Sequence, residues 1–245
     1  MAQLIVDLRS DTVTKPTASM RKAMAEAIVG DDVYEEDPTV KLLEQKAAQI
    51  LGKESALFVP TGTMGNTIGV KLHTRQGQEV LADSRAHILD WELGMTAWFS
   101  GCQIRPVDTP SGVLTWDSVK GKIRKASSVS ASTGLIAIEN THNMAGGIVY
   151  PLDTIREICD NAHAQNIPVH MDGARLFNAS IASGKPAHEI VQHVDSVMVC
   201  LSKGLGAPAG SIIAGSAAVM AEARGLRKRL GGGMRQVTVC DGILF

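Results

Sequence analysis

Apolar residues along the chain follow two spacings that alternate from one segment to the next. Short apolar runs, typical of buried strands, are separated by segments in which apolar residues recur every three or four positions, as on one helix face. The predicted strands cover residues 55–59, 79–82, 103–107, 135–138, 168–171, 196–200 and 211–214. Helices are predicted over 17–29, 38–51, 64–73, 116–125, 186–193 and 217–230, with one more that follows Asp153. This alternation predicts an α/β fold, in which helices cover both faces of a mainly parallel sheet.

Local signals set the limits of several of these helices. Asp37 is an N-cap residue with proline at the next position, and Gly52 ends the same helix. Asp153 is predicted to cap the helix that follows it. In the first helix, Met20, Met24, Ala27 and Ile28 share one face.

Composition excludes several classes of protein. The 245 residues are 44% hydrophobic and 20% charged with a formal net charge of -1, which is ordinary globular usage and lacks the basic excess of most nucleic-acid binders. Aromatic residues make up only 4%, too few for a base-stacking platform. No run approaches the roughly 18 apolar residues of a membrane span, and Asp7 and Arg9 interrupt any signal-peptide core. The cysteines are widely spaced, which is typical of a reduced, cytoplasmic chain: Cys102, Cys159, Cys200 and Cys240.

Polar residues follow the predicted strands at the edge where open α/β sheets bind ligands. They are Thr61-Gly62-Thr63, His87, residues 140–143, residues 172–175 and Ser202-Lys203. Each alone is a weak signal, because an Asp or Lys after a strand is usually a turn or solvated residue. Their concentration at one edge predicts a site there.

The Gly-rich turn at residues 61–65 leads from a strand into a helix, where free N–H groups and the helix dipole suit a phosphate. The sequence motifs of nucleotide binding and of a nucleophilic serine elbow are absent. The zinc motif H-E-x-x-H is absent as well, since His188 and His193 lie five residues apart. A phosphate cradle, an acid and an amine are what pyridoxal 5′-phosphate requires. From residue types alone, this cofactor is one option among several.

Seven sequence blocks narrow the choice. They are DLRSDTVT (7–14), GDDVY (30–34), PTGT (60–63), ENTHN (139–143), HMDGAR (170–175), CLSKGLG (200–206) and GGGMRQ (231–236). Together, and in this order, they resemble the low-specificity L-threonine aldolases, which are fold type I pyridoxal phosphate enzymes with an aspartate-aminotransferase-like large domain. The resemblance runs from Asp7 to Gln236.

The resemblance implies a role for each matching residue. Lys203 would hold the cofactor as a Schiff base, and Asp172 would pair with its ring nitrogen. His87 would stack on the ring near the substrate hydroxyl. Further cofactor and substrate contacts are also implied: phosphate contacts from Gly62, Thr63 and Met64, a phosphate or active-site contact from Arg235 of this or a neighbouring subunit, and contacts near the substrate carboxylate and cofactor oxygen from Ser10 and Arg175. Trp91 and Glu92 match an aromatic and an acid that relatives often have after this histidine.

The implied reaction is the cleavage of L-threonine or L-allo-threonine to glycine and acetaldehyde, with no metal. His87 is our candidate for the base that removes the hydroxyl proton, directly or through water, a contribution of about 10²–10⁴ in rate. Pure stacking is an equal alternative for this residue. The resemblance further implies a homo-oligomer, dimer or tetramer, with active sites shared between subunits.

Two departures from the family pattern change what we expect. Val129 stands where relatives commonly have a histidine that holds the substrate hydroxyl. After Gln236 the chain ends within nine residues, where the family continues into a small C-terminal domain bearing an arginine for the substrate carboxylate. We therefore predict a large domain over 1–230 and a truncated start of the C-terminal domain over 231–245. The alternatives are an impaired form that binds cofactor or full-length subunits, and another reaction on the same scaffold, such as transamination or β-elimination.

Overall fold

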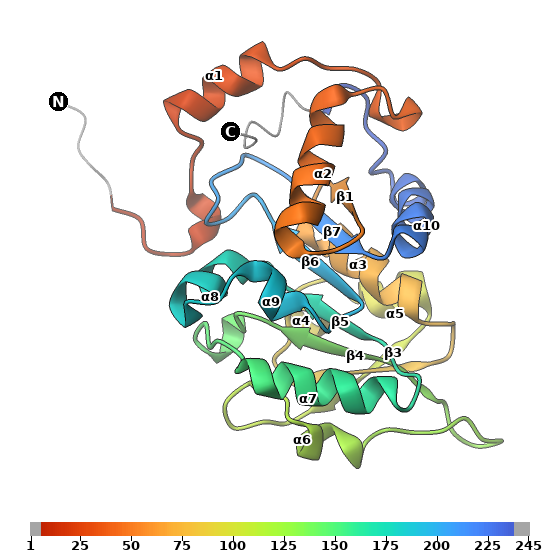
Figure 1. Ribbon diagram of the computed structural model, residues 1–245. Helices are drawn as coiled ribbons and strands as arrows, with labels where there is room; N and C mark the ends of the chain where they lie inside the picture. The colour runs from red at the N-terminus through yellow and green to blue at the C-terminus, as the bar shows by residue number, and fades with distance from the viewer. Residues whose placement is uncertain (1–5, 238–245) are drawn as a thin grey trace.

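The computed structural model describes residues 6–237, which form a seven-stranded mixed sheet in the order β1-β7-β6-β5-β4-β2-β3 (Figure 1). The strands are β1 (Ser55–Val59), β2 (Glu79–Asp83), β3 (Gln103–Val107), β4 (Thr133–Glu139), β5 (Val169–Asp172), β6 (Ser196–Cys200) and β7 (Ser211–Gly215). Strand β7 runs antiparallel to both β1 and β6, and the other neighbouring pairs are parallel. The predicted α/β class and mainly parallel sheet are confirmed.

Helices cover both faces of this sheet (Figure 1). One face carries α2 (Pro38–Leu51), α6 (Trp116–Lys120), α7 (Leu152–His163), α8 (Leu176–Ser183) and α9 (Ala187–Val191). The opposite face carries α3 (Gly62–His73), α5 (Met95–Ser100) and α10 (Ala217–Arg229). The short helix α4 (His87–Asp90) follows β2, and α1 (Ala18–Glu26) lies apart from the sheet.

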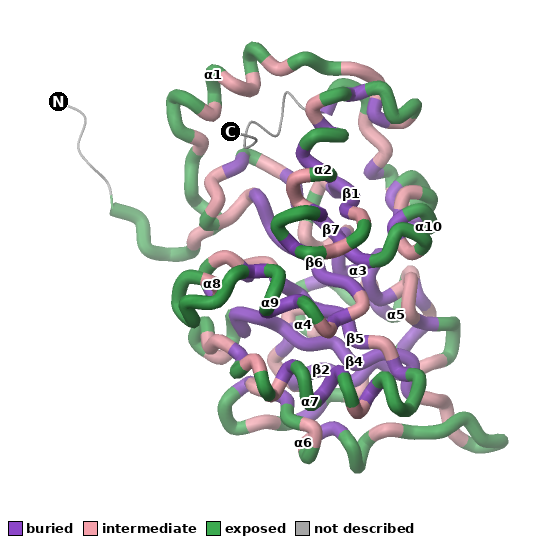
Figure 2. Tube along the Cα trace, viewed as in Figure 1, coloured by how far each residue is buried: buried purple, intermediate pink, exposed green. Residues whose placement is uncertain are grey.

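The core lies between the sheet and these two helical layers, and the strands are its most deeply buried part (Figure 2). In strand β1, alternate side chains pack against the two helical layers. Ala56 and Phe58 pack in the apolar cluster under α2, whereas Leu57 and Val59 pack in the cluster under α3 and α10. Because successive side chains of a strand point to opposite faces, a continuous apolar run is what a sheet covered on both sides needs.

Several predicted limits of the elements need correction. Helix α1 has no fully buried residue, and Ile28 beyond its end is 73% exposed. Met20, Met24 and Ala27 are half-buried, so the apolar face of the first predicted helix is only partly covered. Pro151, and not Asp153, is the N-cap of α7. Asp153 lies in the first turn, where its negative charge interacts favourably with the helix dipole. Helix α6 ends before Gly121, earlier than predicted. The pattern missed α4, α5 and α8, because four to eight residues give too little periodicity.

The parallel strands bring polar groups from distant segments to one edge. Glu139 at the end of β4 is the register partner of Asp172 at the end of β5, and the Asn140 amide donates to the Asp172 carbonyl at 2.9 Å. The division at residue 230 stays a prediction, and residues 238–245, including Cys240, lie outside the described residues. Within residues 6–237, no helix is long and apolar enough to cross a membrane.

Candidate active site

A cavity of about 320 Å³ opens at the carboxyl ends of the central strands, between the start of α3 and the loop after β6. Its lining includes Gly62, Thr63, His87, Asp172 and Lys203, which the sequence placed in one site although 141 positions separate the first from the last. The predicted convergence of amine, acid and Gly-rich turn is therefore present in the fold. The chemical roles of these residues stay predictions.

The Gly-rich turn forms the start of α3. The Thr61 side chain caps this helix by accepting from the Met64 amide at 3.1 Å, and Gly62 and Thr63 supply the first helical N–H groups. A Cβ on Gly62 would lie 2.9 Å from Cys200 Sγ, so a larger residue would push into the cavity lining. A helix start bordering a cavity is a favourable place for an anion such as a phosphate.

Asp172 is buried at the end of β5, where two donors fix its carboxylate. The Ala174 amide donates to Oδ1 at 3.0 Å, and the Asn66 side chain donates to Oδ2 at 2.8 Å. The side chain is 6% exposed, so its negative charge is screened little by solvent. Such a carboxylate suits a cationic partner, for example a protonated pyridine nitrogen.

His87 is held by two carboxylates. Its backbone N–H donates to Glu139 Oε2, and its ring Nδ1 lies 2.9 Å from Glu92 Oε1. Glu92 Oε1 also accepts from Asn66, so it is an acceptor and His87 Nδ1 carries the proton. In the neutral ring, Nε2 then holds the free lone pair. The hydrogen bond to Glu92 raises the pKa of His87.

Glu139 was part of a recognised block, but its role is visible only in the structure. Its carboxylate accepts from the backbone N–H groups of His87 and Asn143, both at 2.9 Å, and thereby joins the loops that follow β2 and β4. Burial raises its pKa to about 7. Glu139 thus fixes the position of the segment that carries His87.

The N-terminal arm reaches the site through two contacts. Arg175 makes a two-pronged ion pair with Asp11, with both N–O distances at 2.8 Å, and Thr14 donates to the Lys203 carbonyl at 2.7 Å. Ser10 caps the short turn that begins at Asp11 and is exposed. The arm therefore contacts both Arg175, which follows β5, and the Lys203 loop, although neither Ser10 nor Arg175 is among the cavity-lining residues of the described chain.

Arg235 and Met64 are not among the residues that line the cavity in the described chain. Arg235 pairs with Asp31 at 2.7 Å and lies over the Tyr34 ring at 5.7 Å. Met64 belongs to the first turn of α3 but is not among the residues that line the cavity. Their predicted contacts with a cofactor stay predictions, and that of Arg235 was already expected to involve a neighbouring subunit.

The residue that sequence reasoning missed is Asn66. Its position four residues after Gly62 places it on the same side of α3, and this spacing is the one signal that pointed to it. Asn66 donates to Glu92 and to Asp172 from the same amide nitrogen. One possible metal-ligand atom from each of His87, Glu92 and Asp172 lies within 4.8 Å of the other two, close enough to hold a metal ion. A cation there would displace the Asn66 amide hydrogens that the two carboxylates accept.

Known proteins resemble this chain over nearly its whole length. The family model described as beta-eliminating lyase matches residues 7–241. A low-specificity L-threonine aldolase of Arabidopsis thaliana is 46% identical over 98% of this chain and 68% of its own length. An uncharacterized Caenorhabditis elegans protein, R102.4, is 45% identical over 94% of this chain, which spans 56% of that relative.

A solved structure shows the same fold. The threonine aldolase of Leishmania major superposes with a TM-score of 0.82 at 21% identity, over 96% of this chain and 69% of its own. The family match, the relatives and the shared fold agree with the seven sequence blocks. The chain belongs to the low-specificity L-threonine aldolase family, within the beta-eliminating lyases.

Proposed function

We propose that this chain binds pyridoxal 5′-phosphate and cleaves the Cα–Cβ bond of L-threonine and L-allo-threonine, which gives glycine and acetaldehyde. The observation that carries the proposal is the placement of Lys203 and Asp172 in the lining of one cavity that the start of α3 also borders. The names of the aldolase relatives supply the substrate class. The same proposal includes a cytoplasmic homo-oligomer, dimer or tetramer.

The described residues fit this cofactor. Lys203 offers an amine for a covalent bond, the first N–H groups of α3 suit a phosphate, and buried Asp172 suits a protonated ring nitrogen. A cavity of about 320 Å³ accommodates a small molecule of this size. When bound, the cofactor supplies an electron-withdrawing ring that accepts the electron pair released as the bond to Cα breaks.

The chain's own residues handle charge and protons. Asp172 keeps a positive charge on the ring side of the cavity, because its carboxylate is buried and held by two donors. His87 accepts the substrate's hydroxyl proton at Nε2, since Glu92 holds the proton of the neutral ring on Nδ1. A proton returned to Cα completes glycine. The alternative for His87 is stacking alone, which needs no free Nε2.

Recognition of the substrate hydroxyl would then fall to His87. Val129, at the position where relatives commonly have a histidine, is 92% exposed and does not line the cavity. The hydroxyl-binding histidine of those relatives therefore has no substitute at this position. We expect weaker discrimination at the β carbon than a site with two histidines would give.

A second candidate is cofactor binding without efficient turnover, by this chain alone or paired with longer subunits. It is favoured by the cavity lining of the described residues, which includes no arginine that could hold the substrate carboxylate. A charged contact to the substrate carboxylate contributes about 1.5–3 kcal/mol per hydrogen bond, so its loss would reduce turnover more than cofactor affinity. Other reactions on this scaffold, transamination or β-elimination, would yield a keto acid.

The test combines product analysis with a chemical trap. Purified protein is incubated with pyridoxal 5′-phosphate and then with L-threonine or L-allo-threonine, and glycine, acetaldehyde and keto acids are quantified. Borohydride reduction followed by peptide mass spectrometry is expected to find the cofactor on Lys203. Glycine and acetaldehyde in equal amounts support the aldolase, and labelled Lys203 without products supports the second candidate. Absence of any label at Lys203 contradicts both.

A further inference from the structure

Helix α3 packs unusually close to the sheet, at a point that neither the phosphate nor the Lys203 chemistry explains. A Cβ on Gly65 would lie 2.5 Å from Met198 Cγ, and one on Gly69 would overlap the His170 ring. Glycine is a poor residue for a helix interior, so two of them on one face indicate that close approach is needed. Asn66 lies next to Gly65, where its side chain reaches the ends of the strands.

Asn66 makes three hydrogen bonds and is 1% exposed. Its amide nitrogen donates to Glu92 Oε1 at 2.7 Å and to Asp172 Oδ2 at 2.8 Å. Its oxygen lies 3.2 Å from His170 Nε2. Carboxylates only accept, so the amide nitrogen must face them and its two hydrogens are both used.

A buried chain behind Asn66 fixes this orientation. Because Asn66 Oδ1 accepts, His170 Nε2 carries a proton and Nδ1 accepts from the Ser196 hydroxyl at 2.8 Å. Ser196 Oγ in turn lies 2.8 Å from His73 Nε2. Burial lowers the pKa of His170 to about 3, so its ring stays neutral and keeps one tautomer. Each donor in this chain therefore has an assigned acceptor.

The shared donor matters because two acids meet here. Oxygens of Glu92 and Asp172 lie within 4.8 Å of each other in a buried position, where like charges repel strongly. We propose that Asn66 is a positioning residue: its amide bridges the acid at the end of β5 and the His87–Glu92 pair, and the chain His170–Ser196–His73 holds that amide in register. The part of this proposal that concerns the cofactor rests on the proposed function.

A packing role alone predicts different consequences. If Asn66 only filled space, its replacement would lower stability and leave protonation at the site unchanged. If it bridges the two acids, its loss raises the pKa of Glu92, which Asn66 now lowers and which His87 and Asp172 also face. Protonation of Glu92 would then remove the negative charge that strengthens the hydrogen bond to His87 Nδ1–H.

The experiment compares Asn66→Ala and Asn66→Ser with Thr74→Val. Thr74 follows the last residue of α3 and donates to the Val70 carbonyl at 2.7 Å, so Thr74→Val removes one buried hydrogen bond from the far end of the same helix without touching the two acids. Carbon-13 NMR of the side-chain carboxyls in the cofactor-free protein measures the Glu92 pKa. We expect a rise of about one pH unit or more in Asn66→Ala, a smaller rise in Asn66→Ser, which keeps one donor, and none in Thr74→Val.

A second readout follows the cofactor. Each variant is loaded with pyridoxal 5′-phosphate labelled with nitrogen-15 in the ring, and the protonation midpoint of that nitrogen is measured by NMR. We expect the midpoint to shift by about one pH unit in Asn66→Ala, because Asp172 loses the donor that orients Oδ2. A smaller shift is expected in Ser196→Ala, which releases the His170 tautomer. Folded variants with an unchanged Glu92 pKa and an unchanged ring midpoint would overturn the proposal. A wild-type chain that fails to bind the cofactor overturns the proposed function, while the Glu92 measurement still decides the bridging role of Asn66.

Discussion

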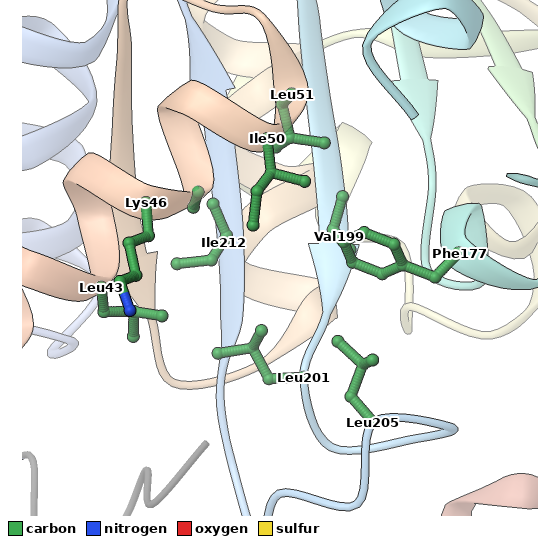
Figure 3. Close-up of a pocket in the computed structure, with 10 residues that line it drawn as sticks. Leu43, Lys46, Ile50, Leu51, Phe177, Val199, Leu201, Leu205 and Ile212 are labelled. Carbon is green, nitrogen blue, oxygen red and sulfur yellow. The ribbon is translucent and has the colours of Figure 1, made fainter. Parts of the chain in front are cut away.

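Two hollows of similar size occur on this molecule, and they differ in what lines them. The candidate site, about 320 Å³, has a mixed lining that includes the polar and charged side chains of His87, Asp172 and Lys203. The second hollow, about 290 Å³, is an apolar groove between α2, the strands β6 and β7, and α8. Figure 3 shows its walls, with Leu43 and Ile50 on α2 facing Phe177 across Ile212 and Val199, and Lys46 alone carrying a charge.

The difference shows what a site needs beyond volume. In the candidate site, hydrogen bonds orient each acid, as the Asn66 and Ala174 donors orient Asp172. The groove offers shape and apolar area, but Leu, Ile and Phe side chains do not fix the orientation of a polar ligand. We therefore expect chemistry to depend on the candidate site and stability to depend on the groove.

The largest effect should come from Lys203. Replacement of Lys203 by alanine removes the amine that the proposed covalent bond requires, so activity on L-threonine should fall by at least about 10³-fold. Lys46→Ala, in the wall of the groove, is the matched control and should change activity less than about two-fold. Initial rates of glycine formation measure both. Comparable losses in the two variants would erase the distinction between the hollows.

The groove is tested next, through Leu43. This side chain is 6% exposed, so Leu43→Ala should lower the free energy of unfolding by about 2–4 kcal/mol, because buried area is lost and a cavity remains. Leu42→Ala on the same helix, where the side chain is 37% exposed, should cost less than about 1 kcal/mol. Urea unfolding gives these values. Affinity for pyridoxal 5′-phosphate should stay within about two-fold in both variants, and a large loss would link groove and site.

Gly69 tests the close packing of α3 behind the site. An added methyl group would overlap the His170 ring, so Gly69→Ala should destabilise the fold by about 1–3 kcal/mol. Gly225 in α10 has no atom within 4 Å of its added Cβ, and Gly225→Ala should instead stabilise by up to about 1 kcal/mol. Thermal unfolding distinguishes the signs. Equal stabilisation by both substitutions would contradict the packing.

The smallest expected effect is a shift in pH dependence. As a base, His87 must be neutral, and the hydrogen bond to Glu92 raises its pKa above 6.5, so activity should fall as pH drops through that raised value. Glu92→Gln removes the charge that favours the protonated ring, and the acid limb of kcat/KM should move to lower pH by about one unit. Asp90→Asn changes an exposed acid at the end of α4, the helix that begins at His87, and should leave the limb in place. An unmoved limb in Glu92→Gln would favour stacking for His87.

Much of the fold was predictable from local patterns. Strands β1, β3 and β6 have the predicted limits, because an apolar run between turn residues is a local signal. The limits of α2 were also predictable, since Asp37 accepts from two amides and Gly52 adopts the left-handed conformation that ends a helix. Helix α1 was misjudged at its apolar face, because spacing shows that residues share a face but not what covers it.

The candidate site was also predictable only in part. The sequence placed Lys203, Asp172, His87 and the Gly-rich turn in one site, because parallel strands end at the same edge and the motifs resemble a known family. It gave no sign that Asn66 bridges Glu92 and Asp172 or that Glu139 holds the His87 backbone. These contacts depend on side-chain directions that no spacing rule specifies.

The sequence by itself therefore determined the α/β alternation, the edge of the sheet where ligands bind and the residue types available there. Only the tertiary structure decided which acids share a donor, which ring nitrogen of His87 is free, and that Arg235 pairs with Asp31. The physical reason is range. Strand and helix signals act over a few neighbouring residues, whereas the Asn66–Asp172 hydrogen bond joins residues 106 positions apart and forms only when α3 packs on the sheet.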